Sequence, residues 1–149
     1  MDAFAAIAEV AASESPLWAD ALRPSHEREL VAVFSPLAPQ QFTLGLETVY
    51  EAYLVHYGNS RLFDSPVDHE RVLLGDYLYA HGLVRIATAG GVDAVAVMAD
   101  LISTCAALRA RCGDRDGEVW VDVARRLGGV PGDEDVARAL ARHYVRVES

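Results

Sequence analysis

The sequence has 149 residues, of which 52% are hydrophobic and 23% charged, and its formal net charge is −9. This composition is typical of one globular domain and excludes a disordered chain. The acidic charge disfavours binding of nucleic-acid backbones, and because all 13 basic residues are arginine, lysine chemistry is excluded. The N-terminus lacks the basic residues of a secretory signal, and no apolar run reaches bilayer length, so we expect a cytoplasmic protein without a transmembrane segment.

The first third of the chain predicts short helices. Residues 2–14 are rich in alanine and predict a helix, and residues 16–22 can add one or two turns. Ser25 is a suitable N-cap for a further helix that we expect to run to about Phe34. Pro36 and Pro39 then interrupt the chain.

Helical spacing of apolar residues recurs through the remainder of the chain. The predicted helices cover residues 41–56, 66–89, 92–111, 117–127 and a segment that begins at Asp133. Glycine pairs at positions 90–91 and 128–129 separate some of them. Strand signals are nearly absent. The sequence therefore predicts one all-α domain over residues 1–149, an antiparallel bundle of about six to eight helices with short loops.

Two cysteines lie seven positions apart, at Cys105 and Cys112. On one continuous helix they would be separated by roughly 10 Å along the axis, which exceeds the reach of a disulfide. We interpret Cys105 as a small core residue and Cys112 as a helix-end residue.

The segment Val72–Ala80 contains one acid within an apolar helix. Gly75 and Gly82 are seven residues apart and share one face, where they permit the close approach of another helix. A buried carboxylate at Asp76 would need a partner, because an unpaired one is costly.

The motif Leu-Leu-Gly-Asp-Tyr-Leu-Tyr-Ala at positions 73–80 resembles a helix of the trans-polyprenyl diphosphate synthases. The stretch 91–109 is similar to the next helix of that family, and 47–56 to the helix that leads to its first aspartate-rich motif. The resemblance covers about residues 41–111. It implies a truncated isoprenoid synthase fold.

The aspartates that hold magnesium in this family have no counterpart here. If His56 takes the family's histidine position, the three aspartate positions fall at Tyr57, Gly58 and Arg61, which are not magnesium ligands. A second alignment, which sets residues 57–59 against a later aromatic-Gly-Asn, also lacks the motif. We therefore expect no catalytic residue, no cofactor and no metal in this chain, with magnesium held by a partner subunit.

The resemblance and these departures together imply a non-catalytic small subunit of a heteromeric heptaprenyl- or hexaprenyl-type synthase. Its partner would be the catalytic subunit, and it would contribute interface and product-length control; a homodimer remains an alternative. Activity of the chain alone is not expected. The candidate interface or ligand-pocket residues are Tyr50, Tyr53, His56, Leu74, Gly75, Asp76, Tyr77 and Gly82.

Two other functions stay open. A stand-alone helical domain would bind an isoprenoid or another apolar ligand in a pocket lined by Tyr50, Tyr53, Leu74 and Tyr77. An acid–base enzyme would use Asp76 with His56 or His81, which requires two of these groups within reach of one substrate proton.

Overall fold

The computed structural model describes residues 2–111 and 115–147, and it is all-α, as predicted. Over these residues the only β pairing is an isolated bridge between Leu22 and Phe63. Three 3₁₀ turns, η1 to η3, precede the larger helices at Ser25–Glu27, Ser35–Leu37 and Gln40–Phe42. The six α-helices are α1 (Ala3–Glu14), α2 (Pro16–Ala21), α3 (Thr43–Tyr57), α4 (Asp68–Ala110), α5 (Asp116–Arg126) and α6 (Asp133–Val147).

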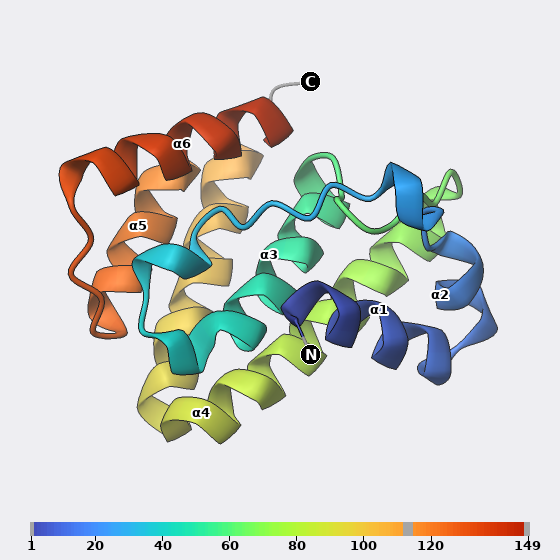
Figure 1. The fold of residues 1–149 in the computed structure, drawn as a ribbon, viewed down its shortest axis with the longest axis horizontal. Coiled ribbons are helices and arrows are strands. Elements are labelled where there is room, and N and C mark those ends of the chain that lie inside the picture. The colour runs from blue at the N-terminus through green and yellow to red at the C-terminus, as the bar shows by residue number, and fades with distance from the viewer. Residues whose placement is uncertain (1, 112–114, 148–149) are drawn as a thin grey trace.

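Helix α3 lies at the centre of the molecule (Figure 1). Its residues from Gly45 to Val55 are buried without a break. Other elements therefore cover α3 on all sides, which explains why its sequence is apolar around most of its circumference rather than along one stripe. The first part of α4 runs antiparallel to α3, and α6 crosses above the ends of α5 and the second part of α4 (Figure 1).

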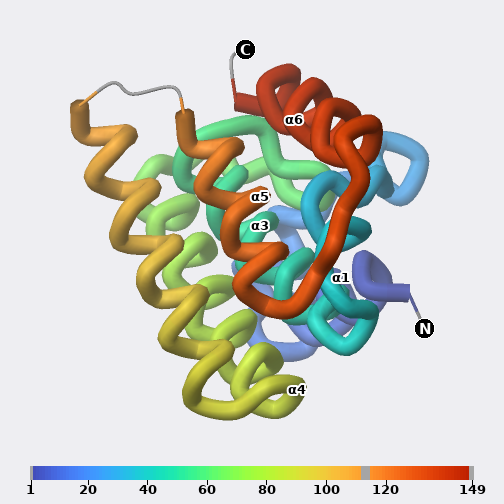
Figure 2. Tube along the Cα trace, turned by 90° about the vertical axis from the view of Figure 1, so that its left-hand side faces the viewer, coloured from blue at the N-terminus to red at the C-terminus, as the bar shows by residue number. Residues whose placement is uncertain are grey.

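Helix α4 is bent at Gly91, where φ is 71° and ψ is −162°. This left-handed backbone strongly favours glycine, because other residues pay a steric cost there. The bend divides α4 into a first arm beside α3 and a second arm that turns back toward α5 and α6 (Figures 1 and 2). The predicted interruption at residues 90–91 is thus confirmed, although helical hydrogen bonding continues on both sides of the bend.

Two apolar cores share α3. The larger lies among α3, α5, α6 and the second arm of α4, and includes Phe34, Tyr50 and Trp120. The smaller lies among α1, α2, the other side of α3 and the first arm of α4, and includes Trp18 and Leu74. Cys105 belongs to the larger core, as predicted, whereas Cys112 lies outside the described residues.

The predicted helix over residues 25–34 is wrong. Only the turn η1 forms, and the chain then runs extended to the segment that contains Phe34. Helical hydrogen bonds are replaced in part by bonds to a distant residue: Glu29 N–H donates to the carbonyl of Arg61, and the carbonyl of Val31 accepts from the Arg61 side chain. These tertiary bonds replace the local hydrogen bonds that a helix would have made.

Much of the apolar surface of α4 is exposed. By length and composition, α4 contains a window that is able to cross a membrane, with a mean hydropathy of 1.6, and 22% of that window is buried. Core helices of globular proteins pass the same test, so this measure alone assigns no location. It does show that the folded chain leaves most of an apolar helical segment uncovered.

Candidate functional site

Three charged side chains form a buried centre beside α3. Glu47 and Glu51 are one helical turn apart on α3, and Arg61 reaches them from the loop that follows the helix. All three residues are at most 1% exposed. Charged side chains are rarely buried this completely unless they are paired, so the centre requires an explanation.

Arg61 binds both carboxylates. Its Nη1 donates to Glu47 Oε2 at 2.8 Å and its Nε donates to Glu51 Oε1 at 2.7 Å. The hydroxyl of Ser60 donates to the other oxygen of Glu51 at 2.5 Å. The guanidinium lies over the rings of Phe4 and Tyr50, with its central carbon 4.7 Å and 5.0 Å from the two centroids. Both carboxylate oxygens of Glu51 are therefore satisfied.

Glu47 is only half satisfied. Its Oε1 has no hydrogen-bond partner, and neither has Nη2 of Arg61. Two carboxylates facing one guanidinium also leave one uncompensated negative charge when both are ionised. Burial raises the pKa of the Glu47 carboxyl, and Arg61 and the Ser35 side chain oppose this shift in part. A buried acid with a perturbed pKa and an open acceptor is a recognised sign of a functional site.

A groove of about 470 Å³ borders Glu47. Separate parts of the chain form its walls. They are the start of α1, the segment that leads into η2, the turn η3 itself, and the start of α3. Polar and apolar groups are mixed in its lining, which includes Asp2, Phe4, Ser35, Gln40, Leu44 and Glu47. Pockets that combine apolar walls with a few polar groups are typical of small-molecule sites.

A second buried polar centre surrounds Asp116, at the start of α5. Its Oδ2 accepts from Arg109 Nη2 at 2.6 Å, from His143 Nε2 at 3.0 Å and from the hydroxyl of Tyr53. The other ring nitrogen of His143, Nδ1, lies 2.8 Å from the Tyr50 hydroxyl, so the imidazole links Asp116 to Tyr50.

This network is satisfied by the protein itself. Burial opposes ionisation, but hydrogen bonds from His143, Tyr53 and Arg109 hold the pKa of Asp116 well below its usual range. The network joins α3, α4, α5 and α6 at one buried point. We interpret it as structural, because Asp116 is 0% exposed and its bonded oxygen is directed at internal donors.

The predicted site residues do not form one cluster. Tyr50 and Tyr53 lie in the larger core and bond to the Asp116 network, whereas Leu74 belongs to the smaller core. Tyr77 stacks on Trp18, with ring centroids 6.0 Å apart. The four residues expected to line one pocket are therefore divided between two cores, on opposite sides of α3.

His56 and Asp76 do meet, as the acid–base alternative requires. Nε2 of His56 lies 3.4 Å from Asp76 Oδ1, and the imidazole also stacks on Tyr79. Burial lowers the pKa of His56, although Asp76 acts in the opposite direction. His81 packs on Tyr77 instead.

The two predicted close-approach glycines both contact α3. A Cβ at Gly75 would overlap the ring of His56, and one at Gly82 would lie 2.6 Å from a methyl group of Val49. The packing role inferred for this glycine face is therefore confirmed.

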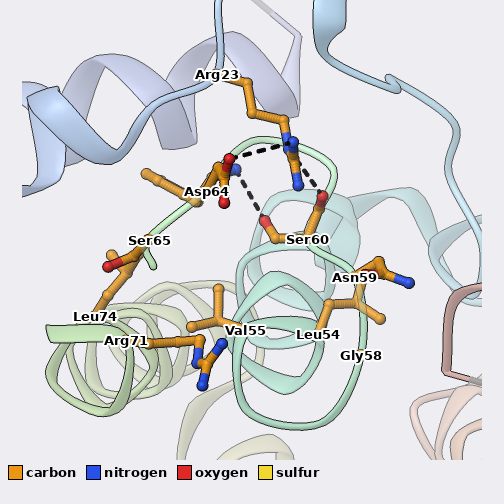
Figure 3. Close-up of a pocket in the computed structure, with 11 residues that line it drawn as sticks. Arg23, Leu54, Val55, Gly58, Asn59, Ser60, Asp64, Ser65, Arg71 and Leu74 are labelled. Carbon is orange, nitrogen blue, oxygen red and sulfur yellow. Dashed lines mark hydrogen bonds and ion pairs between the residues drawn. The ribbon is translucent and has the colours of Figure 1, made fainter. Parts of the chain in front are cut away.

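Leu74 lines a smaller pocket of about 100 Å³ between the first arm of α4 and the loop after α3 (Figure 3). Arg23 and Arg71 approach this pocket from opposite sides. Arg23 bonds to the carbonyl of Ser60, and Arg71 pairs with Asp68. Both cations are therefore already engaged by the protein.

The Glu47 centre is not among the predicted site residues, although the sequence carries a signal for it. Two acids one turn apart interrupt an otherwise apolar helix, which places both of them on a face that must be buried. The family alignment places Arg61 only at the position of a metal-binding aspartate. In the structure it is the cation that pairs with those two acids.

No family model, curated protein or solved structure matches this chain. Within residues 2–111 and 115–147, no group of three or more His, Cys, Asp or Glu side chains is arranged to hold a metal ion.

Proposed function

We propose that the chain is a non-catalytic helical subunit that docks on a trans-polyprenyl diphosphate synthase through the outer face of α4. In this role it would cover part of the catalytic subunit and influence product length. Magnesium and both diphosphates would be held by the partner. The sequence motif that resembles this family, residues 73–80, lies on the helix that would form the interface.

The observation that carries the proposal is the exposed apolar surface of α4. Leu73 and Val84 are 53% and 63% exposed, and Val92, just beyond the bend, is 84% exposed. Leu73 and Val84 are eleven residues apart, which places them on the same face three turns apart. A row of apolar side chains left in water costs free energy, and such patches commonly mark protein interfaces.

Asp76 adds specificity to this surface. It lies one turn from Leu73, and its side chain is 66% exposed. An acid among apolar contacts would select a partner that presents a cation at the matching position, because an unpaired carboxylate would be desolvated at a cost. Gly75, the preceding residue on α4, packs on His56, which the Asp76 carboxylate also faces at 3.4 Å. One short segment thus serves both the internal packing and the outer surface.

Coexpression with the full-length synthase of the same organism tests this proposal. We expect the two chains to copurify, and the complex to make products of a different length distribution from the synthase alone. The paired substitution Leu73→Glu and Val84→Glu should abolish copurification while the helical circular dichroism is retained.

Val130→Glu is the matched control, because Val130 is 95% exposed but lies outside α4. This variant should copurify like the unmodified chain. A complex that survives the α4 substitutions, or an unaltered product distribution, would refute the proposal. Partition of the isolated chain into lipid vesicles would instead assign the apolar face to a membrane.

A stand-alone ligand-binding domain is a second candidate, and the groove beside Glu47 is the observation that favours it. This groove differs from the tyrosine pocket expected from the sequence. It contains no residue of α4, so the two candidate functions use different surfaces and can be tested separately.

A further inference from the structure

The groove beside Glu47 has a chemical character that specifies a class of ligand. Among the buried side-chain atoms without a hydrogen-bond partner in the described residues, Glu47 Oε1 belongs to a residue that lines this groove. Leaving such a group unpaired is costly in a folded protein. A ligand that supplies a donor at this point would remove that cost.

The charge of the site favours a cationic donor. Arg61 compensates only one of the two buried carboxylates, and Asp2 brings a further acid to the rim of the groove. Asp2 already uses Oδ1 to cap α1 by accepting from Ala5 N–H at 2.9 Å. A positive charge in the groove would face both acids, whereas an anion would be repelled by them.

The walls of the groove indicate the chemical nature of the rest of the ligand. Ala3, Phe4, Ala6 and Leu44 contribute apolar surface, and the hollow is much larger than a metal ion. Magnesium and calcium each require about six or more oxygen ligands at short range, which one buried carboxylate and a distant rim do not provide. A hydrocarbon group would occupy the space beside the apolar walls.

We propose that this groove binds a small organic ammonium ion, with its charged nitrogen directed at Glu47 and its hydrocarbon part against Phe4 and Leu44. Gln40, which also lines the groove, offers an oxygen acceptor for another N–H group, whereas the Ser35 side chain interacts with Glu47 itself. Binding would complete the hydrogen bonding of Glu47 and balance the charge of the buried centre. This inference is independent of the α4 interface.

Titration of the ¹⁵N-labelled full chain with hexylammonium chloride, followed by NMR, tests the proposal. We expect saturable shifts confined to the residues around the groove, in segments 2–6, 32–35 and 40–47. Hexanol, which has the same hydrocarbon part and no charge, should bind at least about tenfold more weakly, and sodium hexanoate should not bind. Equal binding of hexylammonium and hexanol would overturn the proposal, because Glu47 would then merely retain a proton.

Two variants locate the effect. Glu47→Gln keeps the shape of the side chain but removes its charge, and should weaken hexylammonium binding by about tenfold or more. The matched control, Glu134→Gln, changes an exposed acid on α6 and should bind as the unmodified chain does.

A third variant keeps the proposal testable if Glu47→Gln fails to fold. Ala6→Phe places a ring in the groove from α1 and leaves Glu47, Glu51 and Arg61 unchanged in sequence. It should abolish binding, and it does not depend on whether Glu47→Gln folds. Unchanged binding by Ala6→Phe, or by a folded Glu47→Gln, would refute the assignment.

Discussion

The imidazole of His56 occupies the space that a side chain at Gly75 would need. A Cβ atom at Gly75 would lie 2.6 Å from Cε1 of His56, closer than real Cβ contacts allow. His56 cannot easily retreat, because it stacks on Tyr79 and faces Asp76. This relationship fixes how closely α3 and α4 approach each other, and it leads to the first prediction.

Gly75→Ala should lower the free energy of unfolding by about 1–2 kcal/mol. Overpacking outweighs the roughly 1 kcal/mol that alanine gains over glycine inside a helix. When His56 is also changed to alanine, the space is free, so Gly75→Ala should then be neutral or stabilising. Urea unfolding of the four members of this double-mutant cycle measures the coupling.

Gly132→Ala is the control for this cycle. A Cβ there would meet only a carboxylate oxygen of Asp135, at 3.7 Å, which is an ordinary contact. It should change stability by less than about 0.5 kcal/mol. If Gly75→Ala costs the same in the presence and absence of the His56 ring, the proposed contact is not the cause.

Asp116→Asn should be strongly destabilising. Asparagine offers one neutral acceptor oxygen to three donors that now share a carboxylate, and its amide group would face Tyr53, His143 and Arg109. We expect a loss of about 3 kcal/mol in urea unfolding, because a buried charge-assisted network is broken. Asp122→Asn, an exposed acid on the same helix, should cost less than about 0.5 kcal/mol.

Two acids, Asp116 and Glu47, should make the free energy of unfolding depend on pH in opposite directions. The pKa of Asp116 is lowered by folding, so its contribution is present above its ordinary pKa of 3.8 and is lost as the pH falls toward the folded value. The pKa of Glu47 is raised, so its contribution is present below its ordinary pKa of 4.5 and is lost as the pH rises through the folded value.

Urea midpoints measured from acid to neutral pH separate the two effects. Asp116→Asn should reduce the loss of stability that occurs as the pH falls below about 3.8. Glu47→Gln should reduce the loss of stability that occurs as the pH rises above about 4.5. A Glu47→Gln variant whose pH profile matches that of the unmodified chain would contradict the assignment of a raised pKa to Glu47.

His56 should titrate below its ordinary pKa of 6.5, because burial disfavours its charged form. Asp76 opposes that shift, so Asp76→Asn should lower the pKa of His56 further. Histidine ring signals followed by NMR against pH measure both values. Asp93→Asn, an exposed change on the second arm of α4, should leave the His56 pKa in place.

Sequence patterns were sufficient to predict the elements that are determined by residues close together in the chain. The apolar spacing of α3 and α4, the glycine pair at the bend and the acidic start of α6 each predict a structure that forms within a few residues. The segment after η1 was mispredicted, since its hydrogen bonds go to Arg61 and to α6, which no local pattern reveals.

The site was harder to predict for the same reason. Tyr50 and Tyr77 both belong to apolar helices, yet they face different cores because α3 is covered on opposite sides. Periodicity identifies a face but not the element that covers it. The pairing of Glu47 with Arg61 spans a helix end and a loop, so only the folded chain brings them together.

The contact between α6 and the extended segment after η1 has a consequence for how the protein is made. Arg146 pairs with Glu29 across 117 positions of the chain, and Arg142 donates to the carbonyl of Ala32. During synthesis, the ribosome releases Glu29 long before α6 exists. The sides of Phe34 and Tyr50 that pack on His143 lack this partner for that whole interval, so part of the aromatic core stays open to other chains until α6 has been translated.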